Sequence, residues 1–129
     1  MAHNRIVHFE IPSAQPEALS RFYGELFGWS FAKAEVPGLD YFFCSRGGEE
    51  GGPGITGAVL TRTDDRQRWT NYVDVASIDE AVEKATALGA RVALAKMPVP
   101  GGRSIAALVD PEGNIFGLIE GPEMAPESA

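Results

Sequence analysis

Residues 110–120 read DPEGNIFGLIE, a tight turn that runs directly into an apolar strand. Pro111 fixes its own φ and Gly113 tolerates a positive φ, so residues 110–113 are typical of a β-turn. The turn delivers the chain into a predicted strand over residues 114–120. We interpret the turn and the strand as part of the last hairpin of a β-sheet.

An earlier stretch, residues 52–60, reads GPGITGAVL and repeats this order of turn glycine, β-branched or aromatic residue, second glycine and aliphatic run. Gly57 stands 60 residues before Gly117, and Gly28 stands 61 residues before Gly89. Both Gly28 and Gly89 end a predicted helix. A near-constant period of this kind predicts two copies of one supersecondary unit.

The chain has 129 residues, of which 44% are hydrophobic. This length supports one sizeable core and is too short for two independent domains. We therefore expect a single domain made of two half-domains that share one sheet. Its predicted parts are a first module at residues 5–61, a linker at 62–68, a second module at 69–121 and a frayed tail at 122–129.

Composition excludes several classes of partner. The net charge of −7 and an isoelectric point near 4.7 argue against nucleic acid and against anionic membranes, because both need a basic surface. Cys44 is the only cysteine, which excludes an intrachain disulfide and a CxxC zinc site. No apolar run approaches the ~18 residues of a membrane span. We expect a protein of the reducing cytoplasm.

The first module begins with a predicted strand at residues 6–11, which Pro12 should end. His8 and Glu10 share one face of this strand. The opposite face is apolar and should meet the helix that follows: Val7, Phe9 and Ile11.

That helix is predicted at about residues 16–27, with Gly28 as its C-terminal cap. Its apolar residues recur at helical spacing: Leu19, Phe22, Tyr23, Leu26 and Phe27. Further strands are predicted at residues 29–35, 40–46 and 55–61, with a flexible loop at residues 47–54. In the strand at 40–46, Tyr41 and Phe43 share one face, but periodicity leaves open which face is inside.

The second module repeats this plan. A strand is predicted at residues 69–75, and Ser77 with Glu80 forms a capping box that begins a helix. The expected buried stripe of this helix is Ile78, Ala81, Val82, Ala85 and Leu88. Strands at residues 91–96 and 103–110 should flank a loop at residues 97–102.

Several short motifs occur together along almost the whole chain: His8, Phe22-Tyr23, Leu26-Phe27-Gly28-Trp29, Tyr72-Val73-Asp74-Val75, Leu88-Gly89-Ala90 and Asp110-Pro111-Glu112-Gly113-Asn114. This pattern resembles the vicinal oxygen chelate superfamily, which includes glyoxalase I, bleomycin-resistance proteins and extradiol dioxygenases. It looks most like the glyoxalase-like proteins. The resemblance implies an α+β fold of two βαβββ modules, with a curved mixed sheet around a cavity and helices outside.

The resemblance also implies a metal on the concave face, held by one residue from the first and last strand of each module. The first position falls on His8. The others fall on Asn71 or its neighbour, on or near Gly57, and on Gly117. Glu120 cannot easily substitute, because an odd offset from Gly117 points it to the opposite face. Since an amide is a poor ligand and glycine has no side chain, we expect neither metal nor cofactor.

A cavity without metal remains the default site for a small molecule, and the two glycines would leave room for it. His8 and Glu10 project from one strand face and are the candidate catalytic pair, suited to proton transfer next to a carbonyl. For His8 the structural alternative is a hydrogen-bonded core histidine. Candidate ligand-binding residues carry hydroxyl, amide, aromatic or thioether groups: Tyr41, Phe43, Thr61, Asn71 and Met97.

Two classes of function therefore stay open. One is a binding module that sequesters a small or cationic compound, as the bleomycin-resistance proteins do. The other is an enzyme, either metal-free with His8 and Glu10, or metal-dependent with another ligand set and lactoylglutathione lyase-like or dioxygenase-like chemistry. Because open sheet edges invite pairing and many members of the superfamily are dimers, we also expect a homodimer.

Overall fold

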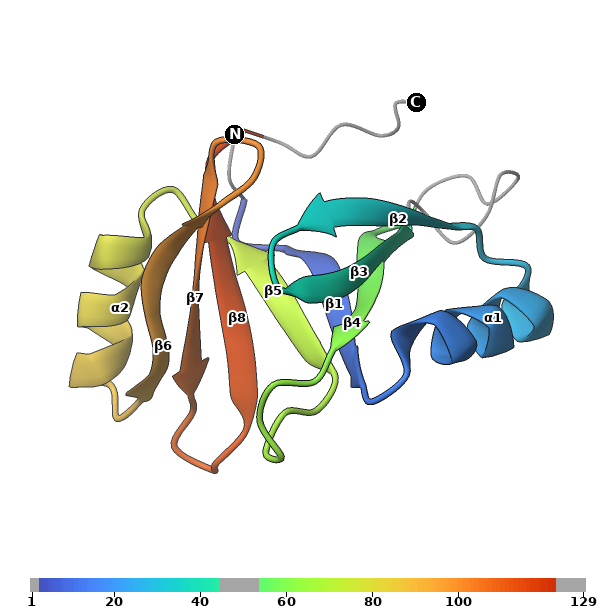
Figure 1. The fold of residues 1–129 in the computed structure, drawn as a ribbon. Coiled ribbons are helices and arrows are strands. Elements are labelled where there is room, and N and C mark those ends of the chain that lie inside the picture. The colour runs from blue at the N-terminus through green and yellow to red at the C-terminus, as the bar shows by residue number, and fades with distance from the viewer. Residues whose placement is uncertain (1–2, 45–53, 123–129) are drawn as a thin grey trace. The chain divides into compact units, whose positions relative to one another are not determined.

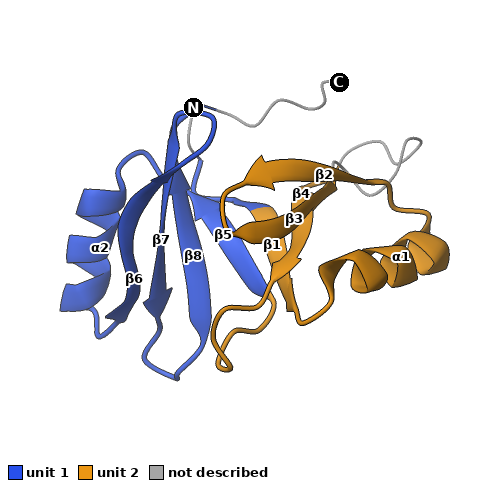
Figure 2. Cartoon of the chain, in the orientation of Figure 1, with its two compact units in different colours: residues 1–7, 70–124 blue, residues 8–69, 125–129 orange. Residues whose placement is uncertain are grey.

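A computed structural model describes residues 3–44 and 54–122, which form two compact units (Figures 1 and 2). Unit 1 comprises residues 1–7 and 70–124, and unit 2 comprises residues 8–69 and 125–129. The predicted loop at residues 47–54 lies outside the described residues except for Gly54, and the predicted tail does so from residue 123.

Unit 2 holds the first βαβββ module. Its elements are β1 (Ile6–Ser13, from His8 onward), α1 (Pro16–Phe27), β2 (Phe31–Val36), β3 (Leu39–Cys44) and β4 (Thr56–Thr61). The strand order is β2-β3-β4-β1. β4 pairs antiparallel with β3 and parallel with β1, so the sheet is mixed.

Unit 1 repeats the module with β5 (Thr70–Asp74), α2 (Ile78–Ala87), β6 (Arg91–Val99), β7 (Arg103–Val109) and β8 (Ile115–Glu120). The strand order is β5-β8-β7-β6, in which β8 pairs parallel with β5 and antiparallel with β7. The predicted α+β class and the two βαβββ modules are confirmed.

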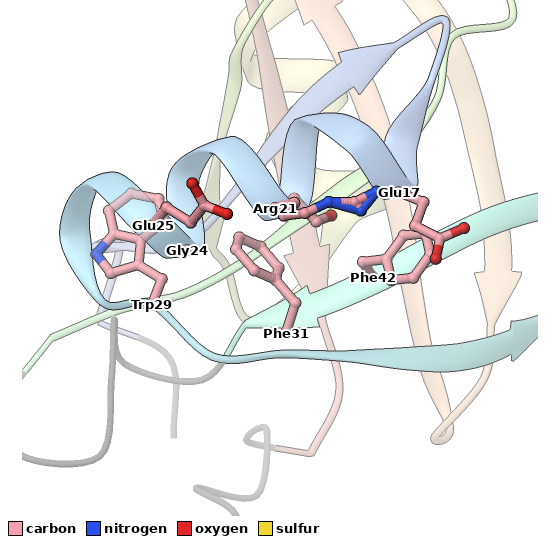
Figure 3. Close-up of a pocket in the computed structure, with 8 residues that line it drawn as sticks. Glu17, Arg21, Gly24, Glu25, Trp29, Phe31 and Phe42 are labelled. Atoms are coloured by element: carbon pink, nitrogen blue, oxygen red, sulfur yellow. The ribbon is translucent and has the colours of Figure 1, made fainter.

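The β1–β4 register determines what each face of the unit 2 sheet carries. His8 lies beside Thr56, Phe9 beside Gly57 and Glu10 beside Ala58. Phe42 pairs with Val59, on the Phe9 and Gly57 face, and lines a groove beneath α1 (Figure 3). Because side chains alternate along a strand, α1 covers the Phe9 face and His8 belongs to the opposite face.

Aromatic side chains fill the Phe9 face of unit 2. The Phe9 ring lies 5.7 Å from Trp29 and 5.8 Å from Trp69, and Tyr23 of α1 stacks on Trp29 at 5.7 Å. A Cβ placed on Gly57 would overlap the Phe9 ring. Gly57 therefore gives space to a neighbouring aromatic ring, and the expectation that it leaves room for a ligand is wrong.

In unit 1, Gly117 has a similar role. It pairs with Tyr72 on β5, and a Cβ on Gly117 would overlap the Tyr72 ring. The space beside this glycine is thus occupied by a side chain of the same unit. Here too the expected room for a ligand is absent.

α2 packs as the sequence predicts except at its end. Ser77 Oγ accepts a hydrogen bond from the Glu80 N–H at 3.1 Å, which confirms the N-cap. Ile78 is fully buried, and its burial contributes roughly 2 kcal/mol of hydrophobic stabilisation. The core around it includes Ala106, Leu108 and Leu118. Leu88 is 71% exposed because the helix ends at Ala87, so its predicted place in the buried stripe is wrong.

α1 has the predicted bounds, but much of its apolar face is exposed. Its bounds and its Gly28 cap are as predicted, with Gly28 at φ 76° and its N–H donating to Gly24 O at 2.8 Å. Three of the apolar residues that recur at helical spacing are more than half exposed: Phe22, Leu26 and Phe27. Unit 2 therefore leaves much of the apolar face of this helix uncovered.

Two prolines lie within strands. The sequence predicted that Pro12 ends a strand and that Pro98 lies in a loop. β1 continues through Pro12 to Ser13, whose carbonyl accepts from the Arg62 N–H on the β4 side. Successive carbonyls alternate in direction, so the missing N–H of Pro12 faces away from β4 and interrupts no bond to it. β6 continues through Met97 and Pro98 to Val99, with register shifts between Val92 and Met97. As the outermost strand of its unit, β6 tolerates a proline.

The turn at residues 110–113 closes around the Asp110 carboxylate. This carboxylate accepts from the N–H groups of Glu112 and Asn114, each at 2.9 Å, and Gly113 has φ 92°. Hydrogen bonds from the backbone and then the side chain of Asn114 hold the pKa of Asp110 below its usual value of 3.8. The predicted turn is confirmed, and the Asp110 carboxylate accepts the hydrogen bonds that close it.

Substituting Gly57→Ala should lower the free energy of unfolding by about 1–3 kcal/mol, because the new methyl group must displace the Phe9 ring. Urea unfolding of the variant measures this. In a Phe9→Leu background the same substitution should cost less, since the overlapping ring is gone. An equal cost in both backgrounds would contradict this account.

Asp110→Asn should lower the melting temperature near neutral pH. A carboxyl group whose pKa is lowered by folding contributes stability above its ordinary value of 3.8, and this contribution is lost as the pH falls through the folded-state pKa. The difference in melting temperature between wild type and variant should therefore shrink in acid. Circular dichroism melts from about pH 7 to pH 2 check this, and a constant difference would refute it.

Candidate functional site

Among the described residues of unit 2, His8 is the most buried polar side chain, at 3% exposed, and it lies on the sheet face opposite α1. Its Nδ1 lies 2.7 Å from Thr56 Oγ1, and its Nε2 lies 3.3 Å from the Tyr41 hydroxyl. The ring also stacks on Phe43, with centroids 6.3 Å apart. His8 is thus held by side chains from β4, which pairs with β1, and from β3, which lies on the far side of β4.

Glu10 lies two residues further along β1 on the same face. Its Oε2 accepts a hydrogen bond from the Tyr41 hydroxyl at 3.3 Å and lies 3.6 Å from His8 Nε2. The Glu10 side chain is 20% exposed, whereas His8 is almost completely covered. Thr56, His8, Tyr41 and Glu10 therefore form a chain of polar groups, the His8 cluster, whose more accessible end is a carboxylate.

The structure brings four of the predicted site residues together in this cluster and its stacking partner: His8, Glu10, Tyr41 and Phe43. Thr61 lies on the α1 face of β4, where its Oγ1 accepts from the Asp40 N–H at 2.9 Å. Asn71 and Met97 belong to unit 1. Asn71 shares a strand face with Val73, which packs against the α2 core, and Met97 is 41% exposed on β6.

Thr56 is the member of the cluster that sequence reasoning missed. The predicted strand at residues 55–61 contains it, but nothing local shows whether Thr56 or Gly57 faces His8. The parallel register between β1 and β4 decides this, and it relates residues 48 positions apart. A hydroxyl one residue before the glycine was the only available signal.

The metal site implied by the superfamily can be tested against these residues. Both ring nitrogens of His8 already lie within hydrogen-bonding distance of hydroxyl groups. The β4 residue beside His8 is a threonine, and Gly57 lies on the other face. Within residues 3–44 and 54–122, no group of three or more His, Cys, Asp or Glu side chains could hold a metal ion. The residues present do not fit the superfamily's metal site.

Glu120 has a structural role in unit 1. Its Oε1 accepts from the Ile78 N–H at the start of α2 at 2.6 Å, and its Oε2 lies 3.3 Å from Lys96 Nζ. Hydrogen bonds to Glu120 and then Asp79 raise the pKa of Lys96. The carboxylate therefore joins β8 to the helix N-terminus, where negative charge is favoured.

A groove of about 360 Å³ lies on the other face of the unit 2 sheet, beneath α1 (Figure 3). Three aromatic residues line it, and its helix side carries alternating charges at one-turn spacing. The lining residues are Glu17, Ser20, Arg21, Gly24, Glu25, Trp29, Phe31 and Phe42. None of the predicted site residues lines it, so the groove and the His8 cluster are separate features of unit 2.

Known proteins share this fold. Residues 7–119 match the model of the glyoxalase-like domain family. The chain belongs to the glyoxalase-like domain family. This places it in the vicinal oxygen chelate superfamily, as the sequence motifs predicted, and the family match spans most of both modules. A comparison with curated proteins finds no match.

Solved structures with the same fold include methylmalonyl-CoA epimerase from Streptomyces coelicolor, in complex with 2-nitronate-propionyl-CoA. It has a TM-score of 0.71 and 18% identity, over 93% of this chain and 99% of the epimerase. A hypothetical protein from Bacillus halodurans has a TM-score of 0.71 and 16% identity, with 94% and 96% of the chains covered. The Mycobacterium tuberculosis epimerase gives 0.68 and 15%, over 96% and 91%. At these identities the similarity establishes the fold alone.

None of the helices within the described residues is long and apolar enough to cross a membrane.

Proposed function

We propose that this glyoxalase-like protein binds a small organic molecule at the His8 face of unit 2, without the superfamily's metal. The observation that supports this is the His8 cluster itself, a set of linked polar groups on the sheet face opposite α1. A histidine with only a structural role needs one or two hydrogen-bond partners. The His8 cluster extends further and ends in a partly exposed carboxylate, Glu10. Tyr41 and Glu10 would supply polar contacts to the ligand, and Phe43 an aromatic surface.

Binding can be tested by nuclear magnetic resonance with a set of small aromatic amines, alcohols and carboxylates. Ligands should shift the amide signals of β1, β3 and β4 in unit 2. Glu10→Gln and Tyr41→Phe should weaken binding at least fivefold, because the first removes a negative charge from the site and the second removes a hydroxyl group.

The matched control is Glu35→Gln on β2. Glu35 is exposed and lies beside Asp40 in the β2–β3 register, on the sheet face that α1 covers. The variant therefore loses the same charge as Glu10→Gln, but on the face away from His8. It should bind like wild type. Equal weakening by Glu35→Gln and Glu10→Gln would contradict a site at His8.

A second candidate is metal-free proton transfer next to a carbonyl. The observation that favours it is the Tyr41 hydroxyl, which lies 3.3 Å from both Glu10 Oε2 and His8 Nε2 and so links a carboxylate to an imidazole. Methylmalonyl-CoA is the first compound to test, because several solved neighbours are epimerases of it by name.

The expected result is deuterium uptake at C2 of methylmalonyl-CoA in heavy water by chelator-treated protein, reduced at least tenfold in Glu10→Gln. Unchanged exchange in that variant would rule out Glu10 as the base. Elemental analysis of the purified protein tests the metal-dependent alternative. Stoichiometric zinc, nickel, manganese or iron would contradict the metal-free proposal.

The homodimer also remains a proposal, now supported by the exposed apolar residues of α1. Light scattering at micromolar concentration should give twice the 13.8 kDa of the chain. Phe22→Glu with Phe27→Glu should shift the protein to the monomer, because charges would replace the apolar surface. A monomeric wild-type mass would refute the dimer, and an unchanged dimeric variant would refute this interface.

A further inference from the structure

The groove beneath α1, which we call the α1 groove, has an aromatic side and a charged side (Figure 3). Trp29, Phe31 and Phe42 form the aromatic side, and each is partly exposed. The other side consists of α1 residues whose spacing places them on one helix face: Glu17, Ser20, Arg21, Gly24 and Glu25. A helix normally covers a sheet with its apolar stripe. Here polar and small residues of the helix face the aromatic rings instead.

Two small residues keep the helix side of the α1 groove open. The Ser20 hydroxyl donates to the Pro16 carbonyl oxygen at 2.8 Å, so its polar group is bound within the helix. A Cβ placed on Gly24 would lie 3.1 Å from the Trp29 carbonyl oxygen, so the glycine allows a close approach of the chain after the helix. The resulting volume of about 360 Å³ is small for a ligand pocket, which usually has roughly 300–1,000 Å³. It suits a molecule of amino-acid size.

The charged side chains of the α1 groove do not pair with one another. Glu17, Arg21 and Glu25 are exposed and follow each other at one-turn spacing. Opposite charges four residues apart on a helix can form ion pairs. Among the residues that the structure describes, however, the side chains of these three take part in no ion pair and no hydrogen bond. The groove therefore offers groups of both signs to a ligand.

We propose that the α1 groove binds a zwitterion, namely an α-amino acid with an apolar side chain. Arg21 takes the carboxylate, because a guanidinium group presents a fork of N–H donors that fits one. Glu25 takes the ammonium group at the Trp29 end of the groove (Figure 3), since indole rings attract cations most strongly. Phe31 and Phe42 contact the apolar side chain. A ligand with only one charge leaves either the arginine or the glutamate unmatched.

The spacing of Arg21 and Glu25 fits the two charges of one amino acid. They lie four residues apart, about 6 Å along the helix axis. The ammonium and carboxylate groups of an α-amino acid are bonded to one carbon and are closer together than this. Partners on either side of such a ligand must be further apart than its own charges, as these two are. Glu17 belongs to the first turn, two turns before Glu25, and so lies away from the Trp29 end.

Three probes with the same phenylethyl body test the charge requirement: L-phenylalanine, 2-phenylethylammonium and 3-phenylpropionate. The first carries both charges, the second only the positive charge and the third only the negative charge. In titrations followed by nuclear magnetic resonance, L-phenylalanine should bind roughly fivefold or more tightly than either of the others. The shifts should appear at the amides of residues 17–25 and at the indole N–H of Trp29.

Two pairs of variants assign the charges to their partners. Arg21→Gln should remove the advantage of L-phenylalanine over 2-phenylethylammonium, because the carboxylate then has no guanidinium to bind. Arg91→Gln, the same substitution at an exposed arginine of β6 in unit 1, should keep that advantage. Glu25→Gln should remove the advantage of L-phenylalanine over 3-phenylpropionate. Glu17→Gln, which loses the same charge from the first turn of α1, should keep it.

Equal affinities for the three probes would overturn the zwitterion class, and the absence of shifts in α1 and at Trp29 would overturn the site. Loss of the preference in Arg91→Gln or Glu17→Gln would assign it to the overall charge of the protein and contradict the roles of Arg21 and Glu25. The inference does not rest on the proposed function, which concerns the sheet face opposite α1. Its failure would therefore leave that function standing.

Discussion

The parallel register between β1 and β4 is the constraint on which unit 2 depends. It places His8 beside Thr56 and, one residue on, Phe9 beside Gly57. The first pair builds a polar cluster on the face opposite α1, and the second lets the Phe9 ring pack between two tryptophans on the α1 face. A shift of one residue would put Gly57 beside His8 and Thr56 into the aromatic cluster, so both faces would lose their contacts.

Much of this fold could be predicted because its signals are local. The spacing between Gly28 and Gly89, and between Gly57 and Gly117, indicated a repeated module. The predicted cap of α1 at Gly28 and the predicted N-cap of α2 at Ser77 both occur. His8 and Glu10 could be placed on one face because their separation of two residues is enough within a strand. The contact with Tyr41 settles which face of β3 joins them.

What the sequence could not show was non-local. Strand pairing between segments nearly 50 residues apart determines that Thr56 meets His8, and local periodicity carries no information about that register. The same limit explains the glycines: Gly57 and Gly117 were expected to leave space for a ligand, but neighbouring aromatic rings fill it. Met97 was misassigned to a loop because the shifts along β6 are set by its pairing with β7. Helical periodicity likewise identified the apolar residues of α1 without showing that the chain leaves Phe22 and Phe27 exposed.

The glycine beneath Phe9 has a consequence for how such a protein can diverge. Because Phe9 and its tryptophan partners lie on one face of the sheet and His8 on the other, the side chains around His8 can change without repacking the Phe9 face. Thr56 is the position at which a descendant could gain a carboxylate next to His8, since its neighbour Gly57 already satisfies the sterics of the opposite face. Two adjacent residues of β4 thus serve different faces of the sheet: Gly57 makes room for the aromatic packing, and Thr56 belongs to the polar cluster.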